Sequence, residues 1–94
     1  MKDILQGYPK PKSSIQEVLL HLILFGNASI VDFATLSGFR TRISQITLTH
    51  GLFLEREWIF AFNKFGNQIK YAKHTLPESE KQKAVNIYYQ LNNQ

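Results

Sequence analysis

Residues 40 to 49 combine small polar side chains and arginines with aliphatic residues at helical spacing. Hydroxyl and amide groups of this kind hydrogen-bond to base edges in the major groove of DNA, while arginines bind phosphates or guanine. On a helical wheel Phe39, Ile43, Ile46 and His50 share one side, which leaves the polar residues on the remaining surface. We therefore expect a helix from about Arg40 to His50 that reads DNA. Its predicted contact residues are Arg40, Thr41, Arg42, Ser44, Gln45, Leu48 and Thr49.

The charged residues are placed as a nucleic-acid binder would place them. The 94-residue chain has a net charge of +4, and the whole excess lies between residues 39 and 75. Fixed cations gathered in one segment can contact phosphates. A solvated surface with chance clustering is the alternative reading of the charge alone. The cations of this segment are Arg40, Arg42, Arg56, Lys64, Lys70 and Lys73, and its only acidic residues are Glu55 and Glu57.

The segment after Gly51 predicts a β-hairpin. Residues 52 to 62 are rich in large apolar side chains, residues 69 to 76 alternate, and Gly66 between them suits a positive φ. A hairpin directly after a polar-faced helix is the arrangement of a winged helix, whose wing contacts phosphates or the minor groove. Phe65 at the tip could wedge against DNA, join a protein interface or fold back onto the sheet. The predicted wing contacts are Lys64, Asn67, Lys70 and Lys73.

A first helix is expected to begin at Ser13 or Ser14. Ser14 and Glu17 have the spacing of a capping box, and Gly26 is a suitable left-handed cap for the other end. The apolar residues of this segment lie on two sides of a helical wheel, so the helix must be covered from two directions.

A second, shorter helix is expected from Ser29 to a turn at Ser37 and Gly38. The Ser29 hydroxyl is predicted to cap the amide near Asp32, and the acidic side chain suits the first turn. The sequence thus predicts a short helix, a glycine turn and a polar-faced helix. The side chains of the second helix predicted to face inward are Ile30, Phe33, Ala34 and Leu36.

A final helix is predicted after Pro77, which suits a first helical turn. It either folds back on the first helix or pairs with a second copy to form a homodimer. The predicted organisation is a flexible arm (1–12), a winged helix-turn-helix domain (13–76) and a C-terminal helix (77–94). The fold class is α+β, mainly α. The apolar stripe of the last helix is Ala84, Ile87, Tyr88 and Leu91.

Residues 14 to 74 resemble small winged-helix domains of phages, prophages and plasmids. The resemblance rests on the capped first helix, on Arg42, Ile43 and Ile46 followed by Gly51, and on the aromatic hairpin. It implies an arginine on the exposed side of the recognition helix and an aliphatic pair in the core. Such domains often carry leucine and arginine where this chain has Ile46 and Thr47.

Enzymatic chemistry finds little support. The three histidines are scattered, cysteine is absent, and no phosphate loop or nucleophile elbow is present, so neither catalysis nor a metal or cofactor is expected. His21 is predicted to be a partly buried, hydrogen-bonded side chain. The apolar run around it is too short for a membrane span. Without cysteine, the cytoplasm is the expected compartment.

The predicted function is sequence-specific binding of double-stranded DNA, as a transcriptional regulator or as a replication or recombination accessory factor. The rival prediction is a winged-helix module that binds and modulates a host protein or enzyme, since one fold serves both uses. Exposed Leu48, Trp58 and Phe65 would favour the rival, because aromatic and aliphatic patches anchor protein interfaces.

Overall fold

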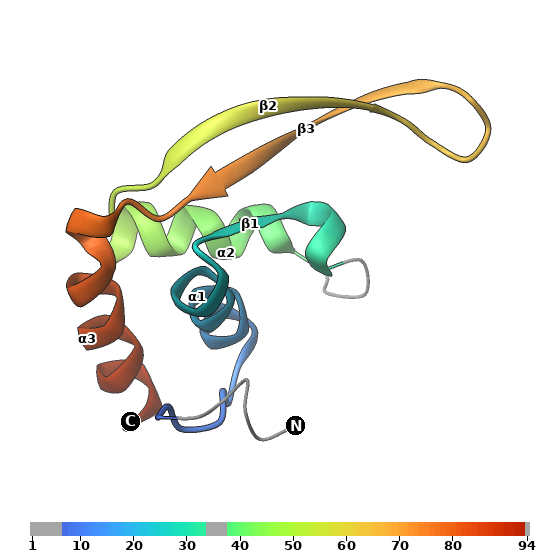
Figure 1. The fold of residues 1–94 in the computed structure, drawn as a ribbon. Coiled ribbons are helices and arrows are strands. Elements are labelled where there is room, and N and C mark those ends of the chain that lie inside the picture. Colours follow the sequence, from blue (N-terminus) through green and yellow to red (C-terminus); the bar gives the residue numbers. More distant parts are fainter. Residues whose placement is uncertain (1–6, 34–37, 94) are drawn as a thin grey trace.

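The fold is α+β, with helices packed beneath a small antiparallel sheet (Figure 1). The computed structural model describes residues 7–33 and 38–93. Strand order in the sheet is β1-β3-β2. The elements are α1 (Ser14–Phe25), β1 (Asn27–Ser29), α2 (Phe39–Ser44), β2 (Glu55–Phe62), β3 (Gln68–Thr75) and α3 (Lys81–Asn92).

Helix α1 begins at Ser14, as predicted, but its N-cap interaction differs from the predicted one. The N-cap is Ser13, whose hydroxyl accepts a hydrogen bond from the Gln16 amide, so the capping box predicted at Ser14 and Glu17 is wrong. The Gln16 side chain also accepts from the Lys12 amide at 3.0 Å, which satisfies a second free donor before the helix. At the other end Gly26 has φ +82° and donates to the Leu22 carbonyl, as predicted.

Helix α1 is buried on both of its apolar sides. Val18, Leu19 and Leu22 are fully buried, and Leu20 and Ile23 nearly so. Helix α2 packs against α1, and so does α3. Three side chains of α3 are buried against α1, so α1, α2 and α3 share one hydrophobic core. These side chains are Ala84, Ile87 and Tyr88.

The second helix predicted from Ser29 is wrong over the described residues. Asn27–Ser29 forms strand β1, which pairs with β3, and only a 3-10 turn at Ile30–Phe33 follows. The Asp32 carboxylate accepts hydrogen bonds from the Ser29 amide (2.9 Å) and hydroxyl, so the predicted capping roles are reversed. The edge of β3 offers this segment backbone partners that local propensity does not anticipate.

The inward residues predicted for that helix have mixed outcomes. Ile30 is exposed, contrary to the prediction, because the segment forms a 3-10 turn after strand β1 instead of a helix with an inward face. Phe33 packs against the core and stacks on the Phe39 ring at 5.4 Å between centroids. Ala34, Leu36 and Ser37 lie outside the described residues. Gly38, the next described residue, has a positive φ of +79°.

Helix α2 continues beyond Ser44 as a π-helical segment, Gln45–Thr49, so the predicted helix is confirmed to within one residue. Phe39, Ile43 and Ile46 are buried as predicted. Where the helix widens, the Thr47 hydroxyl donates to the Ile43 carbonyl at 3.1 Å. The same hydroxyl lies 3.3 Å from the Ser44 carbonyl, so Thr47 bonds back to the helix instead of to solvent.

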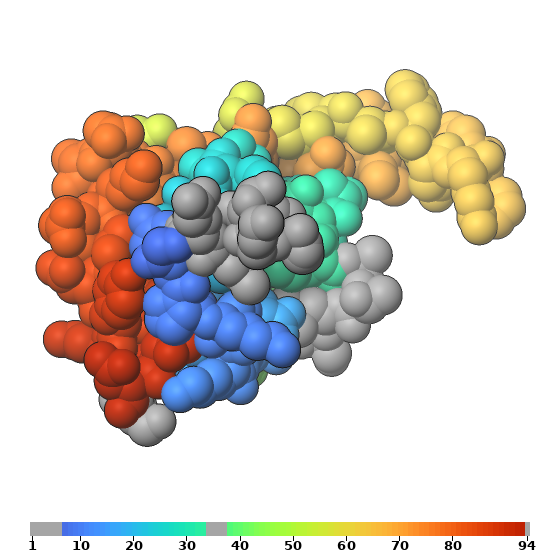
Figure 2. Space-filling view, turned by 60° about the horizontal axis from the view of Figure 1, so that its bottom comes forward, coloured from blue at the N-terminus to red at the C-terminus, as the bar shows by residue number. Residues whose placement is uncertain are grey.

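The predicted hairpin is confirmed, with Glu55 opposite Thr75 and Phe62 opposite Gln68. The Asn63 side chain accepts hydrogen bonds from the Phe65 and Asn67 amides and closes the turn. Strand β1 pairs only with residues 73 to 75 of β3, so the outer hairpin has two strands. This part projects away from the helices, as Figures 1 and 2 show.

Residues 7 to 12 of the predicted flexible arm lie against α3 and α1 (Figure 2). The Tyr88 hydroxyl donates to the Pro9 carbonyl at 2.6 Å. The buried Asn92 amide donates to the Lys10 carbonyl and to the Gln16 side chain, both at 2.8 Å. The Gln16–Asn92 pair therefore joins the arm, α1 and α3 in one polar contact inside an apolar surrounding. Residues 1 to 6 lie outside the described part.

We predict that Asn92→Ala lowers the free energy of unfolding by about 1–3 kcal/mol, because it removes the hydrogen bonds that the buried Asn92 amide donates to the Gln16 side chain and to the Lys10 carbonyl. Urea unfolding followed by circular dichroism measures the change. The matched control is Asn93→Ala at the exposed neighbouring position, expected to change stability by less than about 0.5 kcal/mol. Equal effects of the two substitutions would show that the Gln16–Asn92 contact contributes nothing specific.

Candidate nucleic-acid interface

Helix α2 exposes a polar stripe on the side opposite its buried face. Because Phe39, Ile43 and Ile46 anchor the helix in the core, Thr41 and Ser44 point outward. Leu48 continues the stripe and is 84% exposed. No acidic residue interrupts the helix or its π-helical extension. The stripe therefore offers hydroxyl groups and one aliphatic side chain on a surface without negative charge.

The two arginines of α2 lie on opposite flanks of this stripe. They are two residues apart, which corresponds to about 200° around an α-helix. Arg40 is exposed on the flank that faces the sheet. Arg42 is half-buried on the other flank, and its Nε is buried without a hydrogen-bond partner among the described residues. The half-buried Gln45 and the exposed Thr49 share this second flank.

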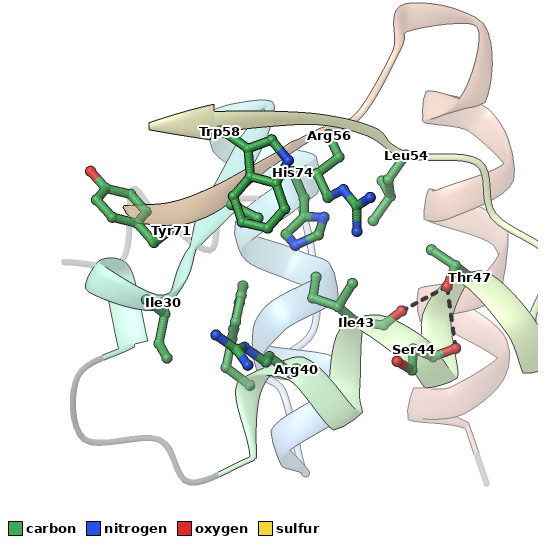
Figure 3. A pocket seen from close by; sticks show the side chains of 12 residues that line it. Ile30, Arg40, Ile43, Ser44, Thr47, Leu54, Arg56, Trp58, Tyr71 and His74 are labelled. Carbon is green, nitrogen blue, oxygen red and sulfur yellow. Dashed lines mark hydrogen bonds between the residues drawn. The ribbon is translucent and has the colours of Figure 1, made fainter. Parts of the chain in front are cut away.

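A groove of about 590 Å³ separates the Arg40 flank of α2 from the sheet (Figure 3). Arg56 and Trp58 reach into it from β2, and His74 lies between them and the helix. Ser44 and Thr47 line the helical wall, but the Thr47 hydroxyl is taken up by backbone carbonyls. The other lining residues are Ile30, Phe39, Ile43, Leu54, Tyr71 and Ala72.

Strand alternation separates the charges of β2. Arg56 is opposite His74 and Trp58 is opposite Ala72, so these residues share the inner face, which looks towards α2. Glu55 and Glu57 therefore lie on the outer face, away from the groove. No acidic side chain among the described residues lines the groove, whereas two arginines do. The groove between α2 and the sheet is thus lined by positive charge.

His74 is partly enclosed at the inner end of the groove. Its ring lies 6.1 Å from the Phe39 ring, between centroids. Burial lowers the pKa of His74 below its usual value of 6.5, and the positive charge of Arg56 lowers it further. Near neutral pH the imidazole is therefore uncharged, and the positive charge of the groove comes from its arginines.

The predicted wing residues divide between the two faces of the hairpin. Lys70 is on the inner face, with its ammonium 4.7 Å from the Trp58 ring centroid. Lys73 is opposite Glu57 on the outer face, because it is an odd number of residues from Lys70. Lys64 at the tip lies 5.4 Å from the Phe65 ring centroid. Phe65 is 77% exposed, so it does not fold back onto the sheet. Asn67, also at the tip, is exposed.

Of the residues that line the groove, the predicted site contained only Arg40 and Ser44, and it omitted the ionisable side chains of Arg56 and His74. Period-two alternation through residues 54 to 58 contains the signal for Arg56, because it places this arginine on the same face as Trp58. The position of His74 depends on the register between β2 and β3, which the sequence pattern leaves open. The prediction that His21 is partly buried and hydrogen-bonded is confirmed, since this half-buried side chain is hydrogen-bonded to the Asn27 carbonyl.

Within the described part of the chain, no three histidine, aspartate or glutamate side chains gather where they could hold a metal ion. Over the same residues, none of the helices has the length and apolar character needed to cross a bilayer. The candidate interface consists of the stripe on α2, the groove and the hairpin.

We predict that acidification lowers the free energy of unfolding through His74. Because its folded-state pKa is depressed, the unfolded chain takes up the proton first as the pH falls through about 6.5. The stability present above that pH is then lost until the folded-state pKa is reached. Urea unfolding between pH 7.5 and pH 5 should show a smaller loss in His74→Gln than in the parent chain.

The same shift has a spectroscopic test. In an NMR titration the His74 pKa should lie below 6.5, and Arg56→Gln should raise it part of the way, because burial remains. A His74 pKa at or above 6.5 in the folded parent chain would contradict the enclosed, uncharged imidazole.

Comparison of the chain with known protein families, curated proteins and solved structures found no match. What the surface can bind is therefore inferred from its own residues.

Proposed function

We propose that this protein binds double-stranded DNA, with α2 in the major groove and the hairpin tip beside a neighbouring phosphate backbone. The observation that carries the proposal is the stripe of Thr41 and Ser44 with an arginine on each flank and no acidic residue. An α-helix fits the major groove, which is about 12 Å wide, and short hydroxyl side chains reach base edges there.

The element order supports a winged helix-turn-helix reading. Helix α1, strand β1, helix α2 and the β2–β3 hairpin follow one another, and the sheet order is β1-β3-β2. The helix that would precede the recognition helix is shortened to the turn at Ile30–Phe33 in the described residues. The hairpin follows α2 directly, as a wing does.

The flanking arginines suit a duplex better than a flat partner. Two phosphate backbones border the major groove, one on each side of an inserted helix. Arg40 and Arg42, on opposite flanks, can each reach one of them. Gln45 and Leu48 then lie towards the bases, where Leu48 can contact a thymine methyl group. At the hairpin tip, Lys64 and Asn67 are free to approach a phosphate of the next groove.

The protein-interaction reading remains the second candidate because one observation favours it. Large apolar side chains interrupt the cationic surface: Leu48 on α2, and Phe62 and Phe65 on the hairpin, are all exposed. Such patches anchor protein partners. In that reading the protein would modulate a host protein or enzyme, and removing the cations would matter less than removing the rings. A homodimer through the apolar face of α3 is disfavoured, because that face is already buried against α1.

We predict micromolar or tighter binding to a random-sequence duplex pool, with a slope of log affinity against log salt of roughly −3 to −6. Fluorescence anisotropy measures the affinity. Arg40→Ala should reduce the magnitude of that slope by about 1, since one phosphate contact is lost. The matched control is Lys81→Ala, an exposed cation on α3. An absence of binding at low salt would favour the protein-interaction reading.

We also predict different effects of Gln45→Ala and Lys64→Ala. Loss of the Gln45 amide should relax base preference at one position, at a cost of about 1–3 kcal/mol on the preferred site, while Lys64→Ala should weaken all sequences alike. The preferred site comes from sequencing the duplexes retained from the pool. Equal losses on preferred and random DNA for Gln45→Ala would count against α2 as the reading helix.

A further inference from the structure

The outer hairpin carries a row of exposed aromatic rings on one face. Trp58, Phe60 and Phe62 occupy alternate positions of β2 and therefore share its inner face. Their exposed fractions are 48%, 64% and 72%, and they rise towards the tip. Phe65 at the tip is also exposed. Monomeric proteins rarely leave rings contiguous in this way unless they bind something.

Cations accompany these rings, and acidic residues do not. Arg56 lies 5.3 Å and Lys70 4.7 Å from the Trp58 ring centroid, and Lys70 is opposite Phe60 across the strands. Lys64 is beside Phe65 at the tip. From residue 58 to residue 77 the chain has no aspartate or glutamate. The inner face of the hairpin therefore combines flat apolar rings with positive charge only.

The same surface continues into the groove. Trp58 is the innermost ring of the row, and it also lines the groove together with Arg56. Arg40 faces these two residues from α2 (Figure 3). An extended ligand bound along the rings from the hairpin tip would therefore reach the groove, where Arg56 and Arg40 add positive charge. The inner face of the hairpin and the groove together form one elongated path, which we call the hairpin path.

The geometry points to single-stranded nucleic acid as the occupant of the hairpin path. Unpaired bases expose flat faces that stack on aromatic side chains, and their phosphates are attracted by the neighbouring lysines and arginines. A duplex hides those base faces. Rings about 6.5–7 Å apart along the strand can receive successive bases of an extended chain. This inference goes beyond the duplex binding proposed above, because it uses Phe60 and Phe62 rather than the stripe on α2.

The test uses fluorescein-labelled dT12 and rU12 with the full chain, measured by fluorescence anisotropy. We expect both to bind, and we expect quenching of Trp58, the only tryptophan of the chain. Phe60→Ala and Phe62→Ala should each weaken binding by roughly 5- to 150-fold. Comparison of dT12 with rU12 distinguishes DNA from RNA as the source of the strand.

Two further variants separate stacking from general apolar contact. Phe62→Leu keeps an apolar side chain but removes the flat ring, so it should weaken dT12 binding as Phe62→Ala does. Phe53→Ala removes a ring that is 60% exposed but precedes β2, outside the hairpin path, and should leave dT12 affinity unchanged. Circular dichroism and urea midpoints show whether each variant keeps the parent fold.

The outcomes distinguish this inference from duplex binding. Loss of dT12 and rU12 binding in the Phe60 and Phe62 variants, with duplex affinity retained, supports the hairpin path. Absence of dT12 and rU12 binding, or equal binding by Phe62→Leu and the parent chain, overturns it whatever the duplex result. Adsorption to phosphatidylserine vesicles that survives Phe62→Leu, without oligonucleotide binding, also overturns it and assigns the rings to a membrane surface.

Discussion

The need to bury helix α1 organises the rest of this structure. Leu19 and Leu22 are fully inaccessible, and Leu20 and Ile23 on the other side are nearly so. Burial of each side chain of this size stabilises the fold by about 1.5–3 kcal/mol, so neither side of α1 can be left in water. Helix α2 covers one side and α3 the other, and the short sheet closes the remaining gap above them (Figure 1).

The same burial decides which side chains are available for binding. Phe39, Ile43 and Ile46 hold α2 in the core, so the polar stripe has to face solvent. On β2, the alternation that turns Trp58 inward also turns Glu57 outward, because successive strand residues point to opposite faces. Packing therefore decides which charged side chains face the groove, and on β2 it places Arg56 there and turns Glu55 and Glu57 away.

The hairpin differs from the body in what supports it. Beyond the part that pairs with β1, its two strands are supported only by their pairing with each other and by cross-strand contacts, such as that of Lys70 with Trp58, among the described residues. An isolated two-stranded hairpin is marginal in water, so bound ligand can add substantially to its order. The stripe on α2 and the projecting hairpin with its exposed rings are the surfaces of the two proposals, binding of a duplex and binding of a single strand.

The sequence by itself determined the elements whose causes are local. Gly26 and the apolar spacing of α1 define the first helix, residues 39 to 49 define the helix that carries the polar stripe, and Asn63 with Gly66 defines the hairpin turn. Only the tertiary structure decided the conversion of Asn27–Ser29 into a strand, because its partner is β3, more than forty residues away in the chain. Nor could the pattern place Arg56, His74 and Arg40 around one groove. Their proximity depends on strand register and on how α2 packs, which are long-range properties that no local spacing encodes.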